Sequence, residues 1–380
     1  MGMEFINMGI LFPMNSLTAH LNGGIPDADI DALAPYWKVF SNLRTCLFAP
    51  GDRNGYSNAM IQAFEVKPTI LNHPDFKAFA KKTLALYTAW KQAHEKCLNG
   101  LEKGSSPKQL IQDISEDLLV RFCNADLMDK YDIYQILMDY WADTMQDDVH
   151  VISQDGWKAG NTLRLLVVEK GKKAREIPDF VMGRKKYKSD LIPPDLIIVR
   201  YFSAEKQAVD DLQARKDLIT LALEQFIEEN SGDEGLVEEA KNDKGKVSKA
   251  TLKARIKEIK GDASATDELA VLKQCLSYMD NETAANTKIK TAKDVLDNKV
   301  FKKYPKLDEA EIKTLVVDDK WQAQLKTGIQ AEIDRVTQTL ATRIKALEER
   351  YADPLPKLTE EVAGLSSKVD EHLKRMGLLW

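Results

Sequence analysis

The chain has 380 residues, enough for two or three domains with cores of their own. Hydrophobic residues make up 44% and charged residues 30%, and the formal net charge of −5 excludes a chain that binds nucleic acid through a strongly basic overall character. The four cysteines form no Cys-x-x-Cys pair, which argues against a disulfide scaffold or a thiolate zinc site and favours the cytoplasm. No apolar run is long enough for a transmembrane helix, and the first eight residues lack the features of a signal peptide.

Helices are predicted over most of the first half. Apolar residues recur three or four positions apart in the segments 36–48, 72–90, 110–122 and 133–141, which is the spacing of one helical face. Runs rich in Val, Ile and Leu predict strands of a small β element at 149–153, 163–169 and 196–202.

Long helices are predicted in the second half, which holds 64 charged residues in 180 and only three of the 13 prolines. Apolar residues alternate three and four apart over 209–226, stop at a polar stretch and resume at Leu252, which predicts an antiparallel helical hairpin.

The longest apolar stripe begins at residue 321, is interrupted by Pro-Leu-Pro and ends at residue 373. A stripe of this kind forms an internal core or accepts a helix of a partner, and periodicity alone does not separate the two. Its candidate interface residues are Trp321, Leu325, Ile329, Ile333, Val336, Leu340, Ile344, Leu347, Leu358, Val362, Leu365, Val369 and Leu373.

The predicted fold is therefore mainly α with a small β element. A helical N-terminal part and a small α/β part are followed by long antiparallel helices, namely a helical hairpin and C-terminal amphipathic helices. The predicted divisions are a linker at 1–35, a compact domain at 36–202, the hairpin at 203–285 and a long-helix region for subunit assembly at 286–380.

The sequence contains none of the motifs GxGxxG, GxxxxGK[ST], HExxH or GxSxG, and no catalytic, cofactor-binding or metal-ligating residue is predicted. An acidic segment at 126–155 holds eight aspartates, of which Asp139 and Asp143 are one helical turn apart. These aspartates cap helices and solvate a surface, or else they form a metal or acid/base site with His150. Their spacing does not match a Ca²⁺ loop.

A basic segment at 170–188 carries eight basic and two acidic residues. Such a segment contacts DNA phosphates, or it is a solvated loop that neutralises the acidic segment. The candidate DNA-contacting residues are Lys170, Lys172, Lys173, Arg175, Arg184, Lys185, Lys186 and Lys188.

Several blocks resemble the region that follows the catalytic domain in modification (M) subunits of type I restriction-modification systems. They are LNGGIPDADIDAL at 21–33 with YW at 36–37, LRTCLF at 43–48, GYS at 55–57, KPTILNHP at 67–74, YDIYQILMDYW at 131–141 with MQDD at 145–148, TLVVDDKW at 314–321 and YADPLP at 351–356. The resemblance covers most of residues 20–380, and no block carries catalytic chemistry.

The resemblance implies an adenine-N6 DNA methyltransferase subunit that uses S-adenosylmethionine. Such a subunit works with a specificity subunit that reads the DNA site and, in the full complex, with a restriction subunit. These methylases hold a base swung out of the duplex in an Asn-Pro-Pro-Tyr/Phe motif. Here the only Pro-Pro, Pro193-Pro194, lies between Ile192 and Asp195, and no glycine-rich cofactor loop precedes a strand.

The chain therefore resembles the C-terminal part of such a subunit, with residues 1–35 as a linker from a missing methylase domain. It is expected to be inactive alone, and S-adenosylmethionine is expected only for the full-length parent. Its expected role is assembly with the specificity subunit and contact with double-stranded DNA. The alternatives are a structural helical protein that forms homo-oligomers through the 321–373 stripe, and a self-contained enzyme built around Asp139, Asp143 and His150.

Overall fold

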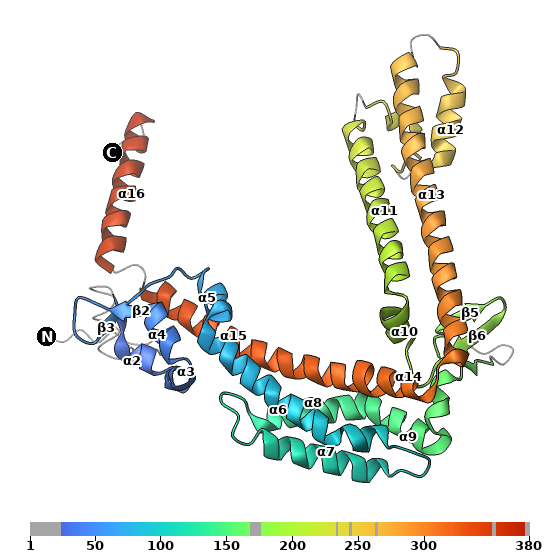
Figure 1. Ribbon diagram of the computed structural model, residues 1–380. Helices are drawn as coiled ribbons and strands as arrows, with labels where there is room; N and C mark the ends of the chain where they lie inside the picture. The colour runs from blue at the N-terminus through green and yellow to red at the C-terminus, as the bar shows by residue number, and fades with distance from the viewer. Residues whose placement is uncertain are drawn as a thin grey trace. The chain divides into compact units, whose positions relative to one another are not determined.

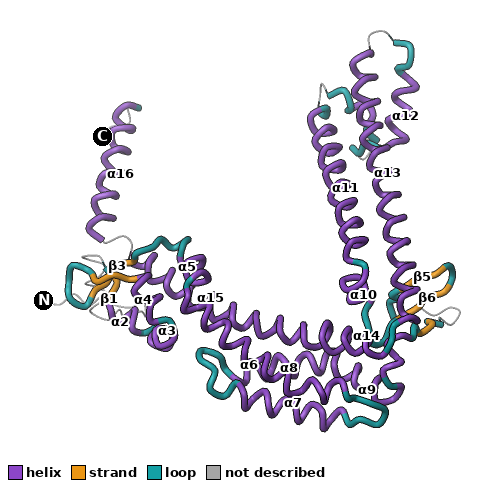
Figure 2. The backbone as a smooth tube through the Cα atoms, in the orientation of Figure 1, coloured by secondary structure: helices purple, strands orange, loops and turns teal. Residues whose placement is uncertain are grey.

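The computed structural model describes residues 24–167, 176–232, 235–242, 245–262, 265–351 and 355–376. Its contacts divide the chain into two compact units. Unit 1 combines Met1–His150 with Trp321–Trp380, and unit 2 is Val151–Lys320. The secondary structure is mainly helical with two small three-stranded sheets, which confirms the predicted fold class (Figure 2). None of the described helices combines the length and the apolar composition that a membrane crossing requires.

Four long helices make up most of unit 1. They are α6 (Pro74–Asn99), α7 (Pro107–Arg121), α8 (Lys130–Tyr140) and α15 (Ala323–Tyr351). α6 and α7 each have proline at the first helical position, where its missing N–H costs nothing. The side chains of His73 and Ser106 accept backbone N–H groups at the two N-termini. α15 packs against α6 and α8, as Figure 1 shows.

The rest of the N-terminal part of unit 1 is a set of short helices around an antiparallel sheet of strand order β1-β3-β2. The sheet and helices are β1 (Ile25–Pro26), β2 (Phe48–Pro50), β3 (Tyr56–Ala59), α2 (Asp27–Asp31), α3 (Ala34–Val39), α4 (Ser41–Leu47) and α5 (Val66–Asn72). The helix predicted at 36–48 is interrupted at Phe40, whose backbone is not helical. Its apolar face still enters the core, because the Phe40 ring packs against Phe76 and Phe79.

Two of the three predicted strands are helices. Residues 149–153 belong to α9 (Gln146–Asp155), and residues 196–202 fall largely within α10 (Pro194–Tyr201). A short apolar run is equally compatible with a buried strand and a buried helical segment, and this ambiguity explains both errors. Only the run at 163–169 contains a strand, β4 (Arg164–Leu165). The chain passes between the units within α9 and within the π-helical segment η6 (Thr314–Gln322).

Unit 2 contains a long antiparallel pair, α11 (Ser203–Glu229) and α13 (Thr266–Lys303), which lie side by side in Figure 1. The arm predicted to return along α11 begins at Leu252, but that segment is α12, and the long partner of α11 is α13. The expected boundary between 285 and 286 lies inside α13. The contact between α11 and α13 contains both apolar and polar side chains. Val209 and Leu223 are buried, whereas Thr220 donates a hydrogen bond to Glu282 at 2.7 Å.

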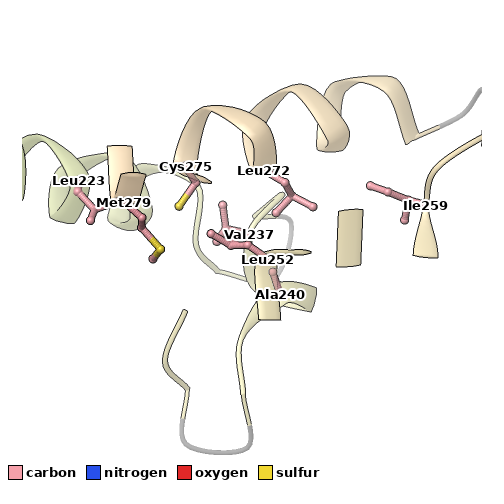
Figure 3. Packing of buried hydrophobic residues seen from close by; sticks show 8 residues of the cluster. All are labelled: Leu223, Val237, Ala240, Leu252, Ile259, Leu272, Cys275 and Met279. Carbon is pink, nitrogen blue, oxygen red and sulfur yellow. The ribbon is translucent and has the colours of Figure 1, made fainter. Parts of the chain in front are cut away.

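A small core closes the far end of this pair. The short helix η3 (Glu238–Ala240) and helix α12 (Lys249–Glu258) pack there against α13. Figure 3 shows the buried side chains of the core, which are Leu223, Val237, Ala240, Leu252, Ile259, Leu272, Cys275 and Met279. Ser248 caps α12 through a reciprocal bond pattern with Thr251, so the helix begins at a defined residue.

The other end of α13 carries the second sheet, of order β4-β6-β5, with β5 (Phe180–Met182) and β6 (Lys185–Lys188). The Phe180 ring packs edge-on against Phe301 and Tyr304, and the Tyr304 hydroxyl donates to the Ile192 carbonyl at 2.6 Å. Helix α14 (Glu309–Lys313) follows α13 and the turn η5 (Tyr304–Lys306).

A charged triad joins α10, α13 and α14. Glu311 accepts from Lys303 at 2.6 Å and from the Tyr201 hydroxyl at 2.9 Å. The Lys303 bond is the main reason that the pKa of Glu311 lies below 4.5. Burial and the bond to Glu311 raise the pKa of Tyr201 to about 12.

Glu311→Gln is expected to lower the free energy of unfolding of unit 2 by about 1 kcal/mol at pH 7, because a charge-assisted bond becomes neutral. A carboxylate with a lowered folded-state pKa stabilises the fold above its unfolded-state pKa, which is 4.5 here. This contribution disappears as the pH falls through the folded-state pKa. Urea unfolding from pH 7 down to about 3.5 measures the difference, which should shrink towards acid pH. A pH-independent difference would contradict the triad.

Gly328 lies where α15 approaches α8 most closely. A Cβ atom there would be 2.5 Å from Ile136 Cγ2. Gly328→Ala is therefore expected to destabilise unit 1 by about 1–3 kcal/mol, despite the roughly 1 kcal/mol that alanine gains in helix propensity. Thermal unfolding measures this loss of stability, and adding Ile136→Ala to the Gly328→Ala variant should recover part of it. Gly364→Ala is the matched control, because a Cβ atom at Gly364 meets nothing within 4 Å and should not destabilise.

Candidate partner and nucleic-acid interfaces

The C-terminal helix α16 (Leu355–Arg375) carries an apolar face that is exposed among the described residues. Every residue from Thr359 to Met376 is exposed. Val362, Leu365 and Val369 are 62%, 61% and 55% exposed, and Leu373 and Met376 continue the same face. Spacings of three and four residues place these side chains on one side of the helix. The side chain of Leu358 lies outside the described part of the chain.

The α15 part of the predicted interface is an internal core instead. Its side chains are at most 9% exposed and face the helices of unit 1, so a partner reaches them only if this core opens. These buried residues are Trp321 in η6 and, within α15, Leu325, Ile329, Ile333, Val336, Leu340, Ile344 and Leu347. Trp321 is the anchor of this region, because its indole N–H donates to Asp148 Oδ2 at 2.7 Å and its ring is fully buried.

Part of the predicted basic segment forms a β-hairpin. β5 and β6 pair antiparallel through a two-residue turn at Gly183-Arg184, in which Gly183 has a φ of +64°. Glycine at the first position of such a turn matches the twist of the strands. Arg184, Lys185 and Lys186 are exposed at this turn, and none forms an ion pair with a described carboxylate. These three residues are called the hairpin tip below.

The remaining basic candidates differ from the hairpin tip. Lys188 donates to the Ile177 carbonyl at 3.2 Å and lies 3.8 Å from Asp179, so its charge is used within the sheet. Arg164 closes the base of the hairpin through bonds of 2.7 Å to both Glu176 and Asp190. Lys170, Lys172, Lys173 and Arg175 lie outside the described residues.

The aspartates of the acidic segment are spread over separate structural roles. Asp129 caps α8, Asp132 pairs with Arg335, and Asp148 accepts from Trp321. Asp139 and Asp143 are exposed, and Asp139 accepts from Gln135 one turn earlier. Among the described residues, no group of three or more His, Cys, Asp or Glu side chains is placed to hold a metal ion. These placements agree with capping and solvation for the aspartates that have partners here.

An apolar groove of about 410 Å³ runs between α11 and α13. Val209, Ala292 and Leu296 line it, and its charged lining residues are Glu205 and Lys288. Glu205 accepts from Lys299 at 2.8 Å, which lowers its pKa. The groove therefore brings together a structural ion pair and apolar side chains, and it offers no general base beside a nucleophile.

One charged surface was missed in the sequence. The segment 241–260 carries eight basic and two acidic residues, the same excess as the segment 170–188. The excess of basic residues indicates this surface, whereas the spacing of the apolar residues there predicts only one arm of a hairpin. The structure places the described cations of this segment, all but Lys244, at the far end of the long helix pair.

Comparison with known proteins identifies no relative: no family model, no curated protein and no solved structure matches this chain.

Proposed function

We propose that this chain is the C-terminal, non-catalytic part of a type I restriction-modification adenine-N6 DNA methyltransferase subunit. In this role it joins the specificity subunit and contacts DNA beside it. The sequence blocks that resemble modification subunits motivate the family, and the uncovered apolar face of α16 is the observation that carries the assembly role. S-adenosylmethionine belongs to the methylase domain of the full-length parent in this proposal, and the restriction subunit joins only the full complex.

The α16 face fits a helix of a partner. Val362, Val369 and Met376 are seven residues apart with Leu365 between them, which is the repeat of a helix that packs along another helix. Removing one aliphatic side chain from water contributes roughly 1.5–3 kcal/mol, so four or five such residues offset much of the ~4–15 kcal/mol cost of association. The specificity subunit is thus expected to present a complementary apolar helix.

The hairpin tip supplies the DNA contact in this proposal. Arg184, Lys185 and Lys186 bring three positive charges to one exposed turn, where they can pair with backbone phosphates. Contacts of this kind bind phosphates of any sequence and leave recognition to the specificity subunit.

The triple variant R184A/K185A/K186A is expected to weaken binding of DNA by the complex with the specificity subunit by about tenfold. The slope of log K against log salt should fall by up to about 2.7, because each lost phosphate contact removes about 0.9. Fluorescence anisotropy with a labelled duplex at several salt concentrations measures both. K288A/K290A/K293A, on exposed positions of α13, removes the same charge and should leave both quantities unchanged. Equal effects of the two triples would remove the hairpin tip from the proposal.

Assembly is tested by mixing the purified chain with the specificity subunit and measuring the mass by light scattering during gel filtration. A stable complex is expected. Failure to form one at micromolar concentrations would contradict the proposal.

Self-association through α16 is the second candidate, and a specific observation favours it. The exposed first half of the helix carries Glu360 and Glu361, and the last turn carries Lys374 and Arg375. Two antiparallel copies would therefore bring opposite charges together. A monomeric mass for the chain alone at high concentration, together with a complex in the presence of the specificity subunit, would leave only the first candidate.

A further inference from the structure

Helix α12 is attached to unit 2 by one face and presents lysines on the other. Leu252 and Ile259 are buried in the small core at the far end of α11 and α13 (Figure 3). Lys253 and Lys257 lie one turn apart, roughly 100° to 140° around the helix from Leu252, and both are exposed. Lys246 before the helix and Lys260 after it are exposed as well. These four residues are called the α12 lysine face below.

The cations on the two flanks of α12 have structural partners. Lys249 donates to Asp280 at 2.8 Å, and Arg255 donates to Glu268 at 2.7 Å, so both tie α12 to α13. The bond from Lys249 is the main reason that the pKa of Asp280 is lowered. The α12 lysine face, in contrast, forms no ion pair within 4 Å with a carboxylate of the described residues. Lys253 lies close enough to Asp280 to help lower the pKa of that carboxyl, and the other three charges are available to an external anion.

We infer that the α12 lysine face is a second DNA-backbone contact, separate from the hairpin tip and carried by the other end of the same helix pair. The inference rests on the proposed function for the identity of the polyanion as DNA. It adds a binding surface that the sequence resemblance does not indicate.

The composition of the face favours DNA over a membrane or a protein. A helix that binds a membrane surface inserts large apolar residues beside its lysines. Here the side chains between the lysines are Ala250 and Ala254, and the large apolar residues of α12 point into the small core. The face also lacks the aromatic residues and arginines that anchor protein interfaces. Lysines alone act as point charges, which suits phosphates in any sequence.

Helix α13 sets the distance between the two basic surfaces. Arg255 of α12 is bound at Glu268 and Lys249 at Asp280, whereas Tyr187 of the hairpin packs on Phe301. At 1.5 Å per residue, the surfaces are separated by about 30 to 50 Å along α13. This corresponds to roughly 9 to 15 base pairs at 3.4 Å each. Figure 1 draws both α12 and the hairpin on the side of α13 away from α11, and the inference places one duplex across both.

The test compares K253A/K257A/K260A, R184A/K185A/K186A and the control K67A/K77A/K96A, on exposed positions of unit 1, in the complete chain bound to the specificity subunit. Anisotropy is measured with labelled duplexes of about 24 and about 8 base pairs, because the short one cannot bridge the two surfaces. On the long duplex, the α12 triple is expected to weaken binding about tenfold and to lower the salt slope by up to about 2.7. The unmodified chain should bind the short duplex without the additional affinity that it has for the long duplex. Circular dichroism of each variant checks that it is folded.

Each other outcome has a distinct meaning. If the α12 triple binds the long duplex like the control while the hairpin triple is weakened, the α12 inference is wrong and the proposed DNA role stands. If neither triple differs from the control, or if the unmodified complex gains nothing from this chain on DNA, the proposed DNA role fails with it. If the α12 triple variant binds DNA normally but binds the specificity subunit or phosphatidylserine vesicles more weakly, the face binds an acidic protein or a membrane. That result would overturn the inference.

Discussion

Trp321→Ala is expected to lower the free energy of unfolding of unit 1 by about 3–5 kcal/mol, which is the usual cost of deleting a buried tryptophan. The indole is fully buried where η6 leads into α15, and its N–H donates to the buried carboxylate of Asp148. Alanine removes both the ring volume and this donor, and losing a donor to a buried charge costs additional free energy. Urea unfolding followed by circular dichroism measures the loss.

Two controls separate the contributions. Trp321→Phe keeps most of the ring but removes the indole N–H, so it should cost less than alanine and isolate the hydrogen bond. Val199→Ala is a matched deletion at an exposed apolar position, and it should change the free energy of unfolding by less than about 0.5 kcal/mol. An effect of Trp321→Ala as small as that of the exposed control would show that Trp321 does not anchor the core.

Loss of the apolar face of α16 is expected to abolish binding of the specificity subunit without destabilising the chain. The variant V362S/L365S/V369S/L373S replaces four exposed side chains that the chain itself does not bury. The affinity should fall at least a hundredfold, since each lost apolar contact costs on the order of 1 kcal/mol or more. Isothermal titration calorimetry measures the affinity, and the Tm should remain within about 2 °C of the unmodified chain.

The opposite face of α16 supplies the matched control. E360A/S367A/E371A/K374A changes four exposed residues of the same helix and should bind within a few-fold of the unmodified chain. Equal losses for the two variants would mean that the helix, and not its apolar face, matters. Full binding by the serine variant would place the specificity subunit elsewhere on the chain.

The helices were largely predictable because their evidence is local. The apolar residues of α6, α7 and α15 recur at helical spacing, and proline with a capping side chain begins both α6 and α7. The failures occurred where a short apolar run had no period of its own. Residues 149–153 and 196–202 are helical because they continue or pack on neighbouring helices, and runs of five and seven residues cannot show that.

The candidate interfaces were only half predictable for a related reason. Trp321 and Val362 belong to one apolar stripe in the sequence, yet one is buried within unit 1 and the other is exposed on α16. Periodicity shows that a face is apolar but carries no information about what covers it. The hairpin tip was found by charge counting, whereas Lys188 of the same segment is bound within the sheet.

The sequence by itself determined the mainly helical class and the position of the basic segment, because composition and spacing are properties of neighbouring residues. Only the tertiary structure decided which part of the apolar stripe is core, which lysines of 241–260 are paired, and that α12 and the hairpin occupy opposite ends of α13. These outcomes depend on contacts between residues far apart in the chain. Burial and ion pairing are decided by those contacts, and no local pattern encodes them.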